Sequence, residues 1–168
     1  MFRPQYNLSE KTLNTLVSIA ETKAIVERAR LLPKQELQLR RQARVRMTQS
    51  STAIEGNTLT TKQVADILAN KQVDAPDREV HEVKNYLQAM EYVDELVEKK
   101  QPLTEKHILN IHKHITRNTL DKDKVGKYRT GGVAVVQRGP GMVQKVMYQA
   151  PDKKEVPGLM KDLVRWLH

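Results

Sequence analysis

The sequence lacks several features that would place the protein in a particular class. It has no cysteine, which excludes disulfide bonds and thiolate metal ligands. Aromatic residues are scarce, with one Trp, one Phe and five Tyr among 168 residues, so the core must be mainly aliphatic, as is typical of helical bundles. No apolar run approaches the length of a membrane span, and the N-terminus has no signal-peptide core. We therefore expect a mainly α, cytoplasmic protein with no membrane partner.

Helix signals divide the chain into three predicted parts. Ser9 can cap a first helix and Pro33 can open a second, so residues 1–50 are predicted to form an N-terminal helical hairpin. In residues 51–100, Thr60 and Gln63 form a capping box for a short helix, and a longer helix with an apolar stripe begins near Asp77. Residues 101–168 begin with a helix near 105–117.

Residues 131–148 interrupt the helical pattern. Alternating apolar residues stand on both sides of a glycine-proline turn at 139–141, and they are Val133, Val135, Val136, Val146 and Tyr148. This pattern predicts a β-hairpin. A two-stranded hairpin is marginal in water, so we expect it to lean on the helices and to keep at least one open edge. A plain connection between helices is the alternative.

The segment Ser50-Ser51-Thr52-Ala53-Ile54-Glu55-Gly56-Asn57 joins a helix end to a carboxylate. Ser51 and Glu55 stand four apart, so on a helix they share a face and the hydroxyl can steady the carboxylate. Gly56 and Asn57 both tolerate the left-handed conformation that ends a helix. We expect Glu55 on the last turn, free to reach a cationic site. Taken alone, the string is also what an ordinary helix end looks like.

This segment resembles the inhibitory motif of the Fic family of protein adenylyltransferases, in which Ser or Thr is followed after three residues by Glu and then by Gly or Asn. The pieces after residue 100 follow the order of the first half of Fic domains: a helix around His112, the string Gly126-Lys127-Tyr128-Arg129-Thr130, the hairpin, Ala150-Pro151, and a helix over 156–167. The resemblance covers roughly residues 45–168. It implies a Fic-like helical bundle, incomplete here, with one β-hairpin flap.

The resemblance also implies roles for individual residues. Glu55 would inhibit by pairing with an arginine of the catalytic loop, Ser51 would orient Glu55, and Gly56 and Asn57 would set the helix end. The flap, with Val133, Val135, Val136, Val146 and Tyr148, would dock the target polypeptide. The family's catalytic loop, His-x-Phe-x-Asp/Glu-Gly-Asn-Gly-Arg-x-x-Arg, does not occur in the sequence, so no catalytic residue is assigned.

We therefore expect the regulatory and target-docking half of a self-inhibited adenylyltransferase, inactive by itself. The complete enzyme would use ATP and Mg²⁺, and neither is expected to bind this chain tightly. Expected partners are a protein substrate on the flap, the remaining half of the Fic core, and a second copy held through the apolar face of the last helix. One alternative is an antitoxin-like module that inhibits a Fic protein in trans.

The other alternative is nucleic-acid binding, because the net charge is +9 and basic residues crowd residues 28–46. That stretch has no interleaved aromatic residues for base stacking, which favours a solvated helix face or a surface toward the rest of the protein. The histidines are not spaced as metal ligands. His112 and His114 diverge on a helix, and His81 lacks a second histidine one turn away, so no metal site is expected.

Overall fold

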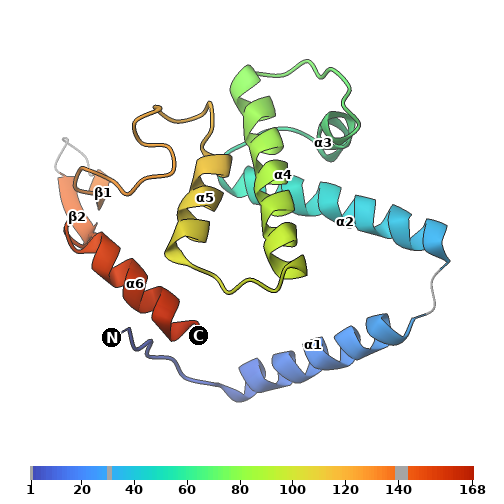
Figure 1. Cartoon of the computed structure of the whole chain (residues 1–168), viewed down its shortest axis with the longest axis horizontal. Coiled ribbons are helices and arrows are strands. Elements are labelled where there is room, and N and C mark those ends of the chain that lie inside the picture. Colours follow the sequence, from blue (N-terminus) through green and yellow to red (C-terminus); the bar gives the residue numbers. More distant parts are fainter. Residues whose placement is uncertain (1, 30–31, 139–143) are drawn as a thin grey trace.

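The computed structural model describes residues 2–29, 32–138 and 144–168. It contains six helices and one two-stranded antiparallel sheet within those ranges (Figure 1). The elements are α1 (Glu10–Arg28), α2 (Pro33–Ile54), α3 (Thr61–Leu68), α4 (Asp77–Glu98), α5 (Glu105–Ile115), β1 (Ala134–Arg138), β2 (Gln144–Gln149) and α6 (Val156–Trp166). The mainly helical fold with one β-hairpin is thus confirmed.

The core lies where α2, α3 and α4 meet. Its fully or nearly buried side chains are aliphatic, and they are Val45, Leu59, Val64, Ile67 and Val83. α3 begins with the predicted capping box, in which the Thr60 hydroxyl accepts from the Gln63 amide and the Gln63 side chain accepts from the Thr60 amide. α5 packs on α4, and α6 packs on α5.

α5 is held to α4 by a buried amide that the sequence reasoning did not identify. Asn85 on α4 is 3% exposed, and its Nδ2 donates to the backbone carbonyls of Ile115, at 3.0 Å, and Arg117. The first is the last carbonyl of α5, one of those that have no partner inside the helix, and the second lies two residues beyond the helix end. Asn85 therefore caps α5 from a neighbouring helix, and α5 ends at Ile115 rather than at the predicted 117.

α1 does not form the predicted packed hairpin with α2. The two helices run separately in Figure 1, and α1 has no buried residue. Its apolar side chains stay largely in solvent, with Leu13, Leu16 and Val17 about half exposed. The predicted N-cap is present, because the Ser9 side chain accepts from the Thr12 amide at 3.2 Å. The local signals therefore determined the helix but not its packing partner.

The predicted boundary between residues 50 and 51 falls inside a continuous helix. α2 runs through the basic stretch and on to Ile54, because no helix-breaking residue intervenes before Gly56. The stretch that carries Ser51 is thus the last turn of the helix that supplies Val45 to the core. No helix among the described residues is both long and apolar enough to cross a bilayer.

α6 keeps part of its apolar face in solvent. Leu159, Trp166 and Leu167 are each close to half exposed, and the described N-terminal segment contributes Phe2, whose ring meets Trp166 edge-to-face at 5.3 Å. His168 Nε2 lies 2.8 Å from the carbonyl oxygen of Leu103, which ties the end of the chain to the loop before α5. Self-association through this face stays a prediction.

Candidate functional site

The end of α2 is a tightly closed helix terminus. The amide of Asn57 donates to the carbonyl of Thr52 at 3.1 Å, and the amide of Gly56 donates to the carbonyl of Ala53 at 3.0 Å. These two bonds form a Schellman motif, which satisfies carbonyls that the helix leaves unpaired. Gly56 takes the left-handed position, with φ of +93°. The prediction that Gly56 ends the helix is confirmed.

Asn57 is not a second left-handed residue, as the sequence had suggested, but a buried connector. It is 6% exposed, and its Nδ2 donates to the carbonyl of Glu79 at 3.0 Å and to Glu82 Oε2 at 2.9 Å. Its Oδ1 accepts from the amide of Leu59 at 3.1 Å. One side chain thus ties the end of α2, the start of α4 and the turn into α3 together.

Thr58 adds further bonds from this junction to α4. The amide and the hydroxyl of Thr58 both donate to Glu79 Oε2, each at 2.8 Å. Charge-assisted bonds of this kind are shorter and stronger than neutral ones. The backbone that follows Glu55 is therefore fixed against α4 at two consecutive residues.

The Ser51 side chain makes no hydrogen bond with Glu55 in the described structure. Its hydroxyl donates to the Tyr86 hydroxyl of α4 at 3.0 Å, so the predicted Ser51–Glu55 contact is replaced by a helix–helix contact. The reason is geometric, because α2 packs on α4 and Ser51 lies on the packed side, half-buried. Ser51 therefore positions the last turn of α2, and with it Glu55, rather than holding the carboxylate.

Glu55 itself lies in solvent at the C-cap of α2. Glu55 is exposed, and it is the last residue before Gly56, with φ of −86° and ψ of 5°. None of the ion pairs among the described residues includes Glu55. A carboxylate thus stands at the end of a helix whose terminus is rigidly anchored, with its own oxygens open to an external cation.

The hairpin pairs β1 and β2 in a register with one bulge. Val135 faces Tyr148 and Val136 faces Val146, so Met147 is the extra residue on β2. The five predicted flap residues are exposed, between 40% for Val136 and 58% for Val135 and Tyr148. Among the described elements the strands contact mainly each other, and neither packs extensively on a helix, contrary to our expectation that the hairpin leans on the helices. The predicted turn at 139–141 lies outside the described residues.

Two residues of the string Gly126–Thr130 fix the base of the hairpin, one by a bond to α5 and the other by a bond across the base. The Tyr128 hydroxyl donates to Glu105 Oε1 at 2.9 Å, and Arg129 Nη2 donates to the carbonyl of Pro151, which joins the chain entering the hairpin to the chain leaving it. Burial and, next, the bonded Glu105 carboxylate raise the pKa of Tyr128 to about 12.

Gly126 fits closely against α5. Its amide donates to His112 Nδ1 at 3.0 Å, and its φ is +67°. A Cβ at this position would lie 2.9 Å from Lys113 Cβ, so any side chain would collide with α5. In the sequence, this string was noted only as part of the family resemblance. In the structure, Gly126, Tyr128 and Arg129 each make a hydrogen bond that holds the string in place.

The end of α2 and the hairpin are two separate candidate sites. No hydrogen bond or ion pair within the described ranges joins them. Across those same ranges, no three His, Asp or Glu side chains gather as a metal site would require.

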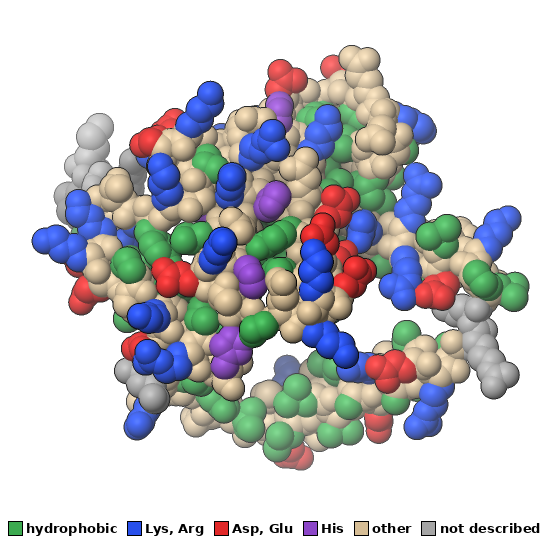
Figure 2. All heavy atoms as spheres, viewed as in Figure 1, with side chains coloured by type: hydrophobic (Ala, Val, Ile, Leu, Met, Phe, Trp, Pro, Cys, Tyr) green, Lys and Arg blue, Asp and Glu red, His purple; other side chains and the backbone are tan. Residues whose placement is uncertain are grey.

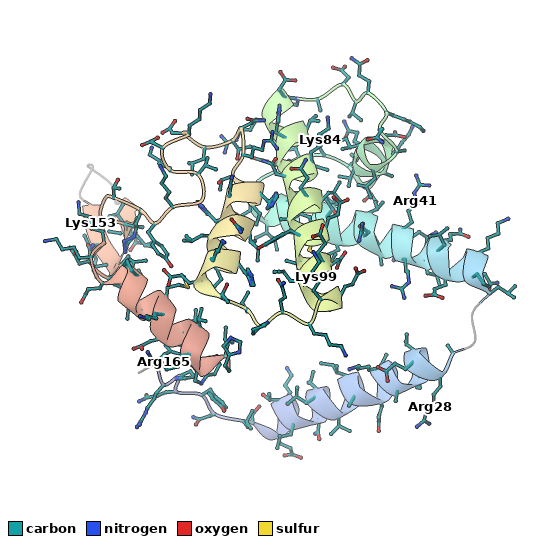
Figure 3. All side chains as sticks on the ribbon, in the orientation of Figure 1. Arg28, Arg41, Lys84, Lys99, Lys153 and Arg165 are labelled. Atoms are coloured by element: carbon teal, nitrogen blue, oxygen red, sulfur yellow. The ribbon has the colours of Figure 1, made fainter. Side chains whose placement is uncertain are left out.

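The basic stretch of α2 is partly ion-paired. Arg40 pairs with Glu36 on its own helix, and Arg44 pairs with Asp94 of α4, both at 2.8 Å. Arg41 projects from α2 in Figure 3, and Arg30 lies outside the described residues. Figure 2 shows Lys and Arg side chains scattered over the visible face and interspersed with acidic ones, not gathered in one patch.

Comparison with known proteins shows that the sequence and the fold are similar to those of Fic proteins. Residues 19–95 match the Fic/DOC family N-terminal region. A solved Fic family protein from Desulfovibrio desulfuricans G20 is 36% identical, with a TM-score of 0.74 over 98% of this chain and 47% of the other. A Fic domain containing signaling protein from Bacteroides thetaiotaomicron VPI-5482 is 26% identical, with a TM-score of 0.67 over 81% of this chain and 50% of the other. The chain thus spans about half the length of each. No curated protein matches the sequence.

Proposed function

We propose that this chain is the front half of a self-inhibited Fic-type protein adenylyltransferase. In that reaction a hydroxyl oxygen of a target protein attacks the α-phosphorus of ATP, its proton passes to a base, and pyrophosphate leaves. The observation that supports the proposal best is the anchored end of α2 with Glu55 in solvent, found in a chain whose fold matches solved Fic proteins.

The inhibitory role rests on how Glu55 is held. A carboxylate can compete with a phosphate for an arginine only if its backbone is fixed, since ordering a free side chain and its backbone would offset the gain. Here the Schellman bonds, Asn57 and the Ser51–Tyr86 contact fix that backbone before any partner arrives. Glu55 would bind the arginine that otherwise receives the γ-phosphate, and ATP would then bind weakly or out of line.

ATP, Mg²⁺ and the catalytic groups would be held by the remaining half of the Fic core, because the residues of this chain offer no phosphate loop and no metal ligand set within the described ranges. This chain contributes the inhibitory carboxylate and the flap. The exposed strands β1 and β2 would dock an extended segment of the target by strand addition and bring its hydroxyl to the catalytic loop.

The test is the variant Glu55→Gly in the full-length protein, with AMP transfer from labelled ATP as the measurement. We expect labelling of the protein itself or of a target to rise by at least about tenfold, since losing one ion pair with the arginine changes the binding free energy by about 1.4 kcal/mol or more. Ser51→Ala should give a smaller rise, because it loosens the last turn of α2 without removing the carboxylate.

The matched control is Glu98→Gly. Glu98 is likewise exposed and ends α4, so this change removes one carboxylate from a helix end and creates the same backbone freedom elsewhere. It should leave labelling at the parent level. Equal labelling by the parent and by Glu55→Gly would refute the inhibitory role.

A further inference from the structure

The outer edge of β1 is a free strand edge with regular geometry. Among the described residues β1 pairs with β2 alone, so the backbone groups on its other side have no partner strand. Such an edge is a template for an added strand. The bulge at Met147 disturbs the spacing along β2, whereas the five residues of β1 follow one another without interruption. An added strand should therefore pair with β1.

One face of the hairpin is apolar at one end and basic at the other. Alternate residues share a face, and the register places Val135 with Tyr148 and, two pairs further, Gln137 with Lys145. Val135 and Tyr148 are each 58% exposed, and Lys145 is exposed as well. Residues of an added strand that stand two apart would meet these two ends in turn.

The surroundings of the hairpin are also basic. The sequence from 127 to 155 has six basic residues and two acidic ones, and no acidic residue stands between 130 and 151. The two carboxylates accept from backbone amides in the turn before α6: Asp152 Oδ1 from Lys154, and Glu155 Oε2 from Asp152. Lys145, Lys153 and Lys154 are in none of the ion pairs that the described residues form, and Figure 3 shows Lys153 beside the strands.

We infer that the occupant of the β1 edge is an extended peptide segment that carries an apolar and an acidic residue two positions apart. The apolar side chain packs beside Val135, on the face that Tyr148 shares, and the acidic one lies on the side of Lys145. An added strand is two strand spacings from β2, roughly 10 Å, a gap that a Lys and a Glu side chain span together. This inference rests on the proposed docking role and names the class of target.

The test uses this chain and three fluorescent peptides that share one alternating Val and Thr framework. The peptides differ only at the positions expected to face Lys145, which are all Glu, all Gln or all Lys. We expect the Glu peptide to bind most tightly by anisotropy and to weaken as salt is added, because exposed charge pairs are screened. The double variant Lys145→Glu with Lys153→Glu should weaken the Glu peptide by about tenfold, at a few-fold for each exposed pair, and strengthen the Lys peptide.

The matched control is Lys11→Glu with Lys34→Glu, which makes the same change of charge at exposed positions of α1 and α2. It should leave the order of the three peptides unchanged. A Glu peptide methylated on alternate backbone nitrogens should lose binding, since strand addition needs those donors.

Two results would overturn the inference, and they can be told apart. Equal affinity for the Glu, Gln and Lys peptides, insensitive to salt, would refute the acidic preference and leave docking on the flap standing. Absence of binding by all three peptides would refute docking on the flap, which is part of the proposed function, together with the inference.

Discussion

Replacing Asn57 by alanine should destabilise the protein more than any neighbouring change at the end of α2. The side chain is 6% exposed and makes three hydrogen bonds, one of them to the Glu82 carboxylate. Alanine leaves the amide of Leu59, a residue that is 3% exposed, without its acceptor. A lost charge-assisted bond and an unsatisfied buried donor together cost about 3 kcal/mol.

Urea unfolding followed by circular dichroism measures this loss, and a thermal scan gives a second value. At about 2–4 °C per kcal/mol for a chain of this length, the melting temperature of Asn57→Ala should fall by roughly 6–12 °C. Asn14→Ala on exposed α1 is the control, and it should change the unfolding free energy by less than about 0.5 kcal/mol. A loss below about 1 kcal/mol for Asn57→Ala would refute the connector role.

Two further predictions concern glycine positions in the backbone and the Tyr128–Glu105 hydrogen bond. Gly126→Ala should lower the free energy of unfolding by about 2 kcal/mol or more, because the new Cβ would collide with Lys113 Cβ. Gly56→Ala has open space around it and should lower the free energy of unfolding by only about 1 kcal/mol. Chemical unfolding that gives the two variants equal stability would contradict this prediction. Because the folded pKa of Tyr128, about 12, exceeds the ordinary tyrosine pKa of 10.0, the contribution of this side chain to the free energy of unfolding is complete below pH 10 and is lost as the pH rises through about 12. Solvent screening holds that contribution to about 1 kcal/mol. Tyr128→Phe should remove this alkaline step from the pH dependence of stability, and an unchanged step would assign it to another group.

The local signals in the sequence predicted the elements well. Ser9, Thr60 with Gln63, and Gly56 each act on a backbone group within a few residues, so the chemistry that marks a helix end is visible in the sequence itself. The pattern of valines between 131 and 148 predicted the hairpin for the same reason, since alternation is a property of one strand.

Contacts between distant residues could not be predicted in this way. Ser51 was expected to hold Glu55, but its partner Tyr86 stands 35 positions away, and nothing local indicates which polar group of α4 will face α2. Asn57 and Asn85 are further examples, because an asparagine in the sequence looks like a turn residue until the fold buries it against another helix.

The Arg129–Pro151 contact makes the hairpin a closed loop on an otherwise helical body. The chain leaves and returns to the helical body at one fixed point. The length and composition of the segment between Arg129 and Pro151 therefore have little effect on the stability of the helical body. Doubling the length of such an excursion would cost only about 0.6 kcal/mol in closure entropy. Evolution can therefore lengthen, shorten or recharge the hairpin while α2 to α5 keep their packing and Glu55 keeps its place.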